Sequence, residues 1–249
     1  HGAYIALVQT LGVRTAELHT AFARSTGDPA FDPEPARADD YAQWKRHLHE
    51  EALATFELLA RRIPQLPATI ADNARGLLER QNQVMQHVDA IALPSGTTLK
   101  TRHHGDYHLG QVLISKNDFI ITDFEGEPAR TLEERRRKHT PLRDVAGMLR
   151  SFSYAAAAAL AKSVESTDDE AKLAPLAADW ETQVRAAFLA AYDETARKAG
   201  IYASREDMQT LLAFFELEKA LYELRYELNN RPDWVRTPLA GIARLLPEG

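Results

Sequence analysis

The sequence predicts a mostly α-helical fold with one small β-hairpin. Apolar residues recur at helical spacing through most of the chain, and this spacing gives way to short β-branched runs only around residues 98–122. The chain has 249 residues, of which 45% are hydrophobic and 27% charged. That length and composition are sufficient to bury one sizeable core or two lobes that share one.

Prolines, glycines and polar clusters set the expected helix boundaries. Three prolines and one glycine in residues 26–35 forbid regular structure there, and Pro64 and Pro67 end the second helical pattern. Acidic residues at 168–170 are typical of the first turn of a helix. The expected helices are 3–24, 36–62, 69–91, 142–163, 173–198, 205–229 and 238–246.

A short hairpin is expected between the helical blocks. Residues 111–115 and 119–122 are short β-branched runs, and a tight turn of Lys116, Asn117 and Asp118 joins them. The chain therefore divides into a helical block at 1–97, a loop and hairpin at 98–126, and a second helical block at 127–249.

Charge and composition exclude several classes of protein. Thirty Lys and Arg residues against 36 Asp and Glu give a net charge of −6, which argues against nucleic acid or an anionic membrane as a partner. No cysteine is present, so disulfide scaffolds, thiolate zinc sites and cysteine nucleophiles are excluded. The longest uncharged apolar run, residues 151–161, is shorter than the roughly 20 residues that a bilayer requires. With no signal-peptide pattern, we expect a cytoplasmic chain.

Residues 103–126 carry the candidate chemistry, because polar side chains gather at the ends of the hairpin, where loops commonly carry function. These side chains are His103, His104, Asp106, His108, Asp123 and Glu125. An inert loop does not account for so many of them. A metal-dependent hydrolase that uses His103, His104, Asp106 and His108 is an alternative. Adjacent histidines in an extended segment point to opposite faces, however, so His103 and His104 would not reach one ion.

Phosphoryl transfer fits the spacing better. This reaction needs a carboxylate that accepts the proton of an attacking hydroxyl, and oxygen ligands that hold Mg²⁺ against nucleotide phosphates. Asp106 precedes Gln111 by five residues, and the hairpin brings Gln111 and Asp123 to neighbouring strand ends. Glu125 follows Asp123 by two residues, on the same side of an extended chain.

Residues 104–111 (HGDYHLGQ) resemble the catalytic loop of the aminoglycoside phosphotransferase and choline kinase-like group, and residues 123–126 (DFEG) resemble its metal-binding segment. Residues 102–152 are most similar to maltokinases, particularly to the maltokinase region fused to trehalose synthase, and the match extends through residues 216–234. The resemblance implies the C-terminal lobe of a protein kinase-like fold. It implies ATP-dependent phosphorylation of maltose to maltose 1-phosphate in glycogen biosynthesis, with Mg²⁺ and ATP. The roles that it implies are catalytic base for Asp106 and Mg²⁺ ligand for Gln111, Asp123 and Glu125.

One face of the helix expected at 205–229 is a candidate sugar site. Glu218, Tyr222, Tyr226 and Asn230 recur every four residues, while a leucine stripe marks the core side. Aromatic rings with charged hydrogen-bonding groups suit sugars, although the same spacing also fits an ordinary surface helix. The resemblance favours a sugar site. Its expected residues are Tyr222, Glu223, Tyr226, Asn230 and Arg231.

Two parts of such a kinase have no counterpart in the chain. The first hundred or so residues contain neither a phosphate-covering glycine loop nor a strand lysine. The family places both in an N-lobe upstream of His1, so we expect a C-lobe fragment with an incomplete ATP site that is inactive alone. A non-catalytic sugar-binding or packing domain of a trehalose synthase fusion is the alternative.

Overall fold

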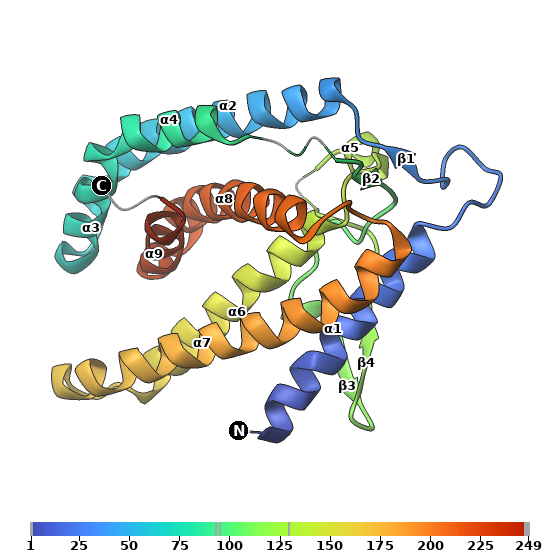
Figure 1. The fold of residues 1–249 in the computed structure, drawn as a ribbon. Coiled ribbons are helices and arrows are strands. Elements are labelled where there is room, and N and C mark those ends of the chain that lie inside the picture. Colours follow the sequence, from blue (N-terminus) through green and yellow to red (C-terminus); the bar gives the residue numbers. More distant parts are fainter. Residues whose placement is uncertain (1, 93, 95, 129, 247–249) are drawn as a thin grey trace. The chain divides into compact units, whose positions relative to one another are not determined.

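The computed structural model describes residues 2–92, 94, 96–128 and 130–246, and these residues are mostly helical (Figure 1). The helices are α1 (Gly2–Phe22), α2 (Ala38–Arg62), α3 (Ala68–Glu79), α4 (Gln81–Ala90), α5 (Leu132–Arg136), α6 (Leu142–Ser163), α7 (Thr167–Ala196), α8 (Arg205–Asn230) and α9 (Arg236–Leu245). The 3₁₀ turns are η1 (Ile63–Gln65), η2 (Leu109–Gln111), η3 (Arg197–Ala199) and η4 (Pro232–Trp234). The prediction of a mostly α fold with a small hairpin is confirmed.

The strands form two small antiparallel sheets. The predicted hairpin consists of β3 (Val112–Ser115) and β4 (Asp118–Ile121). A second pair, β1 (Glu34–Pro35) and β2 (Leu99–Lys100), joins segments far apart in the sequence. The sequence analysis did not predict this pair, because residues 26–35 have the composition of a loop.

Two helix boundaries differ from the predictions for local reasons. The helix expected at 69–91 is two helices, because Arg80 leaves the helical conformation with φ −87° and ψ 8°. Helix α7 begins at Thr167 rather than at 173, so the helix-start signal of the acidic residues 168–170 is confirmed; the Ser166 hydroxyl caps the helix by accepting a hydrogen bond from the Asp169 N–H at 3.2 Å. The sequence also predicts a turn at 93–98, of which residues 93 and 95 lie outside the described residues.

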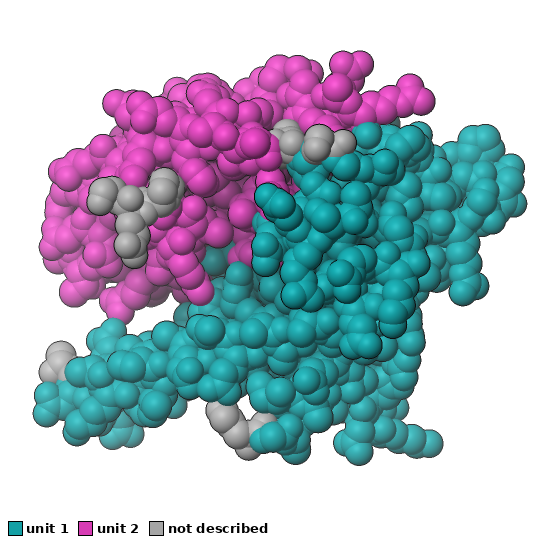
Figure 2. Space-filling model, in the orientation of Figure 1, with its two compact units in different colours: residues 1–36, 94–209 teal, residues 37–93, 210–249 magenta. Residues whose placement is uncertain are grey.

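The chain forms two compact units, and each draws on two chain segments (Figure 2). Unit 1 contains residues 1–36 and 94–209, and unit 2 contains residues 37–93 and 210–249. Unit 1 therefore holds the hairpin and the polar segment, whereas unit 2 holds the predicted sugar face of α8.

In unit 1, α1 and α6 both pack against α7, and Figure 1 shows α1 running beside α7. Gly12 permits this close packing, since a Cβ atom there would lie 2.5 Å from the carbonyl oxygen of Phe188. The rings of Phe152 and Phe188 meet edge to face with centroids 5.6 Å apart. The glycine that interrupts the α1 pattern is thus a packing requirement between two helices.

In unit 2, α3 contacts α9 and α2 contacts α4. The predicted leucine stripe of α8 faces the core, and all four of its residues are buried: Leu217, Leu221, Leu224 and Leu228. Trp44 of α2 packs edge to face against Phe215 of α8, with centroids 5.5 Å apart. In the described part of the chain, every helix is too short or too polar to cross a membrane.

Candidate active site

The β3–β4 hairpin brings Gln111 and Asp123 together. Val112 pairs with Ile121, so the residues that flank the two strands are neighbours, and the Thr122 N–H donates to the Gln111 carbonyl at 2.9 Å. The side-chain amide of Gln111 then donates to Oδ2 of Asp123 at 3.1 Å. The predicted closeness of these two side chains is confirmed, and their role as metal ligands stays a prediction.

The hairpin turn and the segment after it use left-handed backbone. Lys116 and Asn117 have φ values of 50° and 63°, as a two-residue hairpin turn requires. Asp123 also has a φ of 63°, which is uncommon outside glycine, although Asp and Asn tolerate it best. Strained conformations of this kind gather at functional sites, where the surrounding structure holds them.

His104 braces the loop formed by residues 103–111. Its Nδ1 accepts a hydrogen bond from the Asp106 N–H at 3.3 Å, and its Nε2 lies 2.8 Å from the Thr122 carbonyl oxygen. These partners place the ring proton on Nε2, which donates to that carbonyl. His104 therefore ties the segment that carries Asp106 to the end of the hairpin.

Asp144, at the start of α6, holds the same loop through hydrogen bonds to its backbone. Its buried carboxylate accepts the N–H groups of His104 at 2.7 Å and Gly105 at 2.9 Å, and it lies 3.3 Å from Nε2 of His19. Burial favours the neutral acid, but the hydrogen bond from His19, together with the Gly105 N–H, outweighs it and holds the pKa of Asp144 below its ordinary value. From the sequence alone, an ion pair between Arg143 and Asp144 at the start of this helix is the expected link to the loop, whereas in the structure Asp144 contacts the loop through the loop's backbone N–H groups.

Tyr107 anchors the loop to α1 and α6. The Thr15 hydroxyl donates to the Leu11 carbonyl at 2.8 Å, so the Tyr107 hydroxyl, also 2.8 Å away, donates to the Thr15 oxygen. Burial raises the pKa of Tyr107, which keeps this hydroxyl protonated as a donor. On the other side, a Cβ atom at Gly147 would lie 2.7 Å from the Tyr107 carbonyl oxygen.

The carboxylate of Asp106 is 19% exposed and lies 3.8 Å from Nε2 of His108, so a ligand can reach it. Gly105 and Gly126 both have positive φ, and a Cβ atom at Gly105 would lie 3.2 Å from the Gly126 Cα. The two predicted functional loops thus approach each other at glycines. Glu125 is exposed, and its carbonyl accepts from Arg135 at 3.3 Å.

Gln111 and Asp123 fit a magnesium ion in their chemistry. Mg²⁺ is bound by oxygen ligands, usually one or two carboxylates with substrate phosphates and water. The contact between the two side chains uses the Gln111 amide and one Asp123 oxygen. Among the described residues, no hydrogen bond or ion pair occupies the Gln111 side-chain oxygen or the second Asp123 oxygen, so both remain for an ion.

The histidine-based hydrolase alternative does not fit the geometry. Both ring nitrogens of His104 are engaged within the loop, and the ring of His103 packs near that of His139, with centroids 5.9 Å apart. Within residues 2–92, 94, 96–128 and 130–246, no group of three or more His, Cys, Asp or Glu side chains is arranged to hold a metal ion.

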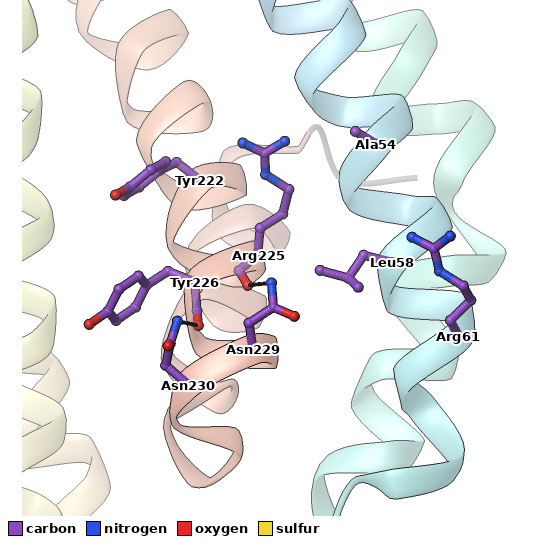
Figure 3. Close-up of a pocket in the computed structure, with 8 residues that line it drawn as sticks. All are labelled: Ala54, Leu58, Arg61, Tyr222, Arg225, Tyr226, Asn229 and Asn230. Atoms are coloured by element: carbon purple, nitrogen blue, oxygen red, sulfur yellow. Dashed lines mark hydrogen bonds between the residues drawn. The ribbon is translucent and has the colours of Figure 1, made fainter. Parts of the chain in front are cut away.

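The predicted sugar face lines a pocket of about 460 Å³ in unit 2 (Figure 3). From α8 it contains Tyr222, Arg225, Tyr226, Asn229 and Asn230, and from α2 it contains Ala54, Leu58 and Arg61. Three of the five expected sugar-binding residues thus lie together. Sequence reasoning missed the α2 residues and Arg225, because no local pattern shows which helix packs beside α8.

The other two expected residues, Glu223 and Arg231, do not line this pocket. Glu223 is buried. Arg231 donates two hydrogen bonds to Glu227, at 2.9 and 2.6 Å, and its guanidinium carbon lies 5.4 Å from the centre of the Tyr226 ring. Arg231 therefore supports the tyrosine from outside the pocket.

Comparisons with known proteins point to sugar kinases, although no protein-family model matches the chain. A glucosamine kinase of Mycolicibacterium smegmatis is 31% identical over 250 residues, covering 99% of this chain and 55% of that protein. A glucosamine kinase of Streptacidiphilus jiangxiensis is 28% identical over 238 residues, covering 96% of this chain and 49% of that protein. The chain spans about half the length of the curated relatives it matches.

A solved structure described as glucosamine kinase in complex with glucosamine, ADP and inorganic phosphate matches 98% of this chain and 52% of its own. The TM-score is 0.73 and the sequence identity 25%, so the chain shares the fold of about half of that sugar kinase. A second crystal form of glucosamine kinase matches with a TM-score of 0.72.

These matches correct the identification of the chain as a maltokinase, which is wrong: the matched relatives and structures are glucosamine kinases. They give no support to maltose as the acceptor, to glycogen biosynthesis, to the absent N-lobe or to a trehalose synthase fusion. The loop motif cannot identify the sugar for a physical reason. A carboxylate base with Mg²⁺ ligands serves phosphoryl transfer to any hydroxyl acceptor, whereas other residues recognise the sugar.

Proposed function

We propose that this chain is part of an ATP-dependent sugar kinase that phosphorylates a hydroxyl group of an amino sugar of the glucosamine class. The contact between Gln111 and Asp123, next to the braced loop of Asp106, carries the proposal. The two relatives described above are glucosamine kinases, and the solved complex contains glucosamine, ADP and phosphate, which supports the sugar and nucleotide classes. The chain then corresponds to the C-lobe of an aminoglycoside phosphotransferase-like kinase.

In this proposal Asp106 orients the sugar hydroxyl and accepts its proton. The hydroxyl oxygen forms the new bond to the γ-phosphorus of ATP, the bond to the leaving ADP oxygen breaks, and the proton passes to the Asp106 carboxylate. The His104 ring accepts a hydrogen bond from the Asp106 N–H, and the Asp144 carboxylate accepts one from the Gly105 N–H. Both contacts hold the backbone that carries the reacting carboxylate. A braced backbone keeps the carboxylate in the reactive geometry.

Gln111 and Asp123 hold Mg²⁺ through their side-chain oxygens, and the exposed Glu125 supplies a further oxygen. When bound, Mg²⁺ offsets the negative charge that develops on the transferred phosphoryl group. The left-handed backbone of Asp123 turns its carboxylate toward Gln111, which a regular strand would not do at that position.

Sugar recognition is assigned to the α8 face that contains Tyr222, Tyr226 and Asn230. Tyrosine rings pack against the apolar C–H faces of a sugar, and the amide and hydroxyl groups exchange hydrogen bonds with sugar hydroxyls.

The metal site can be tested without turnover. We expect Mn²⁺, used as a paramagnetic substitute for Mg²⁺, to broaden the NMR signals of the Gln111 side-chain amide. Asp123→Asn should abolish this broadening, because it removes the carboxylate charge at nearly the same volume. The matched control, Asp72→Asn, changes an exposed aspartate of α3. Equal broadening in the wild type and in Asp123→Asn contradicts the proposed metal site.

The transfer is tested in the complete kinase to which the chain is proposed to belong, by ADP release from Mg·ATP with glucosamine, compared between the wild type and Asp106→Asn. We expect the rate to fall at least 100-fold in the variant, since general base catalysis contributes about 10²–10⁴-fold. Glucosamine-dependent release that is equal in both proteins contradicts the role of Asp106. Glucosamine binding with no transfer in the wild type favours a non-catalytic sugar-binding domain.

A further inference from the structure

The pocket between α2 and α8 has an excess of positive charge. Its two charged lining residues are Arg61 and Arg225, and no aspartate or glutamate lines it. In Figure 3 the two guanidinium groups lie on either side of Leu58. Glu51, which does not line the pocket, forms an ion pair with Arg225 at 2.6 Å. This carboxylate offsets one of the two guanidinium charges.

Arg61 is exposed near the end of α2, and within the described part of the chain its guanidinium group makes no hydrogen bond or ion pair. Its neighbour Arg62 differs, because it donates to Gln65 at 2.9 Å and to Asn229 at 3.1 Å. All five N–H donors of Arg61 are therefore available to a ligand.

Arg225 is only partly used by its ion pair. In the contact with Glu51, a terminal nitrogen of the guanidinium group lies 2.6 Å from a carboxylate oxygen. A guanidinium group has five N–H donors in a planar fork, so Arg225 can hold a second anion while Glu51 fixes its position. The side chain of Arg225 is thus held in place before a ligand binds, whereas that of Arg61 can change its conformation to meet the ligand.

Neutral polar groups lie next to the arginines. Asn230 donates its amide N–H to the Tyr226 carbonyl at 2.8 Å, and among the described residues nothing donates to its side-chain oxygen. The Tyr226 side chain is 45% exposed, and its hydroxyl has no hydrogen-bond partner in the described residues. These two groups can receive sugar hydroxyls at one end while the arginines hold an anion at the other.

We infer that this pocket binds a phosphorylated sugar, with the phosphate on Arg61 and Arg225 and the sugar ring at Asn230 and Tyr226. Arginine binds phosphate through paired charge-assisted hydrogen bonds, which are stronger than neutral ones. The volume of about 460 Å³ lies within the range of about 300–1,000 Å³ typical of small-molecule sites.

This inference deepens the proposed function, since it takes the sugar class from it, but binding of a phosphorylated sugar does not require turnover. Calorimetric titration of the chain with glucosamine 6-phosphate tests it, in parallel with glucosamine and with inorganic phosphate. We expect glucosamine 6-phosphate to bind more tightly than either of the other two, because it alone engages both ends of the pocket.

Two variants locate the binding. Arg61→Gln should weaken binding of glucosamine 6-phosphate at least tenfold by removing one guanidinium group. Asn230→Asp should weaken it as well, because it adds a negative charge to the pocket that binds a negatively charged ligand. The matched control is Arg46→Gln, which removes an exposed arginine of the same helix that does not line the pocket and should leave binding unchanged.

Three outcomes would overturn the inference. These are equal affinities in Arg61→Gln and Arg46→Gln, inorganic phosphate that binds as tightly as the sugar phosphate, and glucosamine that binds more tightly than its phosphate. The proposed kinase function fails separately, through the Mn²⁺ and ADP-release measurements at Asp123 and Asp106. A chain that binds the sugar phosphate but neither holds Mn²⁺ nor releases ADP would therefore retain this inference and lose the proposed reaction.

Discussion

The loop at residues 103–111 in unit 1 and the α2–α8 pocket in unit 2 differ in how their polar groups are held. In the loop, the buried carboxylate of Asp144, which lies 3.3 Å from the His19 ring, accepts two backbone N–H groups, and few residues are fully exposed. In the pocket, the polar groups lie on helix surfaces, and Arg61 has no partner in the described part of the chain. A site for chemistry needs fixed geometry, whereas a site that binds a flexible polar ligand can keep unused donors.

This comparison predicts that loop substitutions cost stability and that pocket substitutions do not. The largest effect is expected for Asp144→Ala, which leaves the N–H groups of His104 and Gly105 and the ring of His19 without their acceptor. Breaking a buried charged network typically costs about 3–5 kcal/mol. Urea denaturation measures the free energy of unfolding, and a loss below about 1 kcal/mol would show that water replaces the carboxylate at this site.

The same carboxylate predicts a dependence on pH. Hydrogen bonds outweigh burial and lower the pKa of Asp144 in the folded state, so its contribution is present above the pKa of the unfolded chain, about 3.9. That contribution is lost as the pH falls below that value toward the folded-state pKa. Below pH 4, the free energy of unfolding should therefore decline less steeply in Asp144→Asn than in the wild type. Parallel declines would contradict the assignment.

Two glycine substitutions compare a close helix contact in unit 1 with an open position on a helix of unit 2. Gly12→Ala should destabilise unit 1 by about 1–3 kcal/mol, because the added methyl group meets the Phe188 carbonyl at 2.5 Å. Gly76→Ala in α3 has open space around it and should stabilise the protein by about 0.5–1 kcal/mol through helix propensity. Thermal unfolding of both variants provides the comparison, and shifts of the same sign would refute the close contact between α1 and α7.

Asp123 should show a conflict between stability and function. Asp123→Gly relieves the left-handed backbone at φ 63° and is expected to raise the free energy of unfolding by about 1 kcal/mol. The same substitution removes the proposed metal ligand, so Mn²⁺ should no longer broaden the Gln111 amide signals. A variant that is less stable than the wild type would mean that the Asp123 side-chain contacts outweigh the backbone strain.

The smallest effect is expected in unit 2. Arg225→Gln removes the ion pair with Glu51 at 2.6 Å, and pairs near the surface contribute about 0–1 kcal/mol. Urea denaturation should therefore place this variant within about 1 kcal/mol of the wild type, although its affinity for a sugar phosphate falls. A loss as large as that of Asp144→Ala would remove the contrast between the two regions.

The local features of both regions could be predicted from the sequence. Helical periodicity placed the leucine stripe of α8 against the core, and the β-branched runs placed Gln111 and Asp123 at neighbouring strand ends. These features depend on residues close together in the chain, whose conformational preferences and hairpin register follow from their own composition. The identity of the acceptor did not follow, because the loop motif describes phosphoryl transfer and leaves the sugar open.

The tertiary structure decided which distant segments meet. It placed α2 beside the candidate sugar face of α8, so that Arg61 joins a pocket with Arg225, and it paired Glu34 and Pro35 with residues 99–100. It also placed His19 of α1 beside Asp144 of α6. Many pairs of amphipathic segments are compatible in pattern, and only packing of the whole core selects among them. The sequence by itself therefore determined most helices, the β3–β4 hairpin and the candidate catalytic residues, while the β1–β2 pair, the pocket and the support of the loop depended on long-range packing.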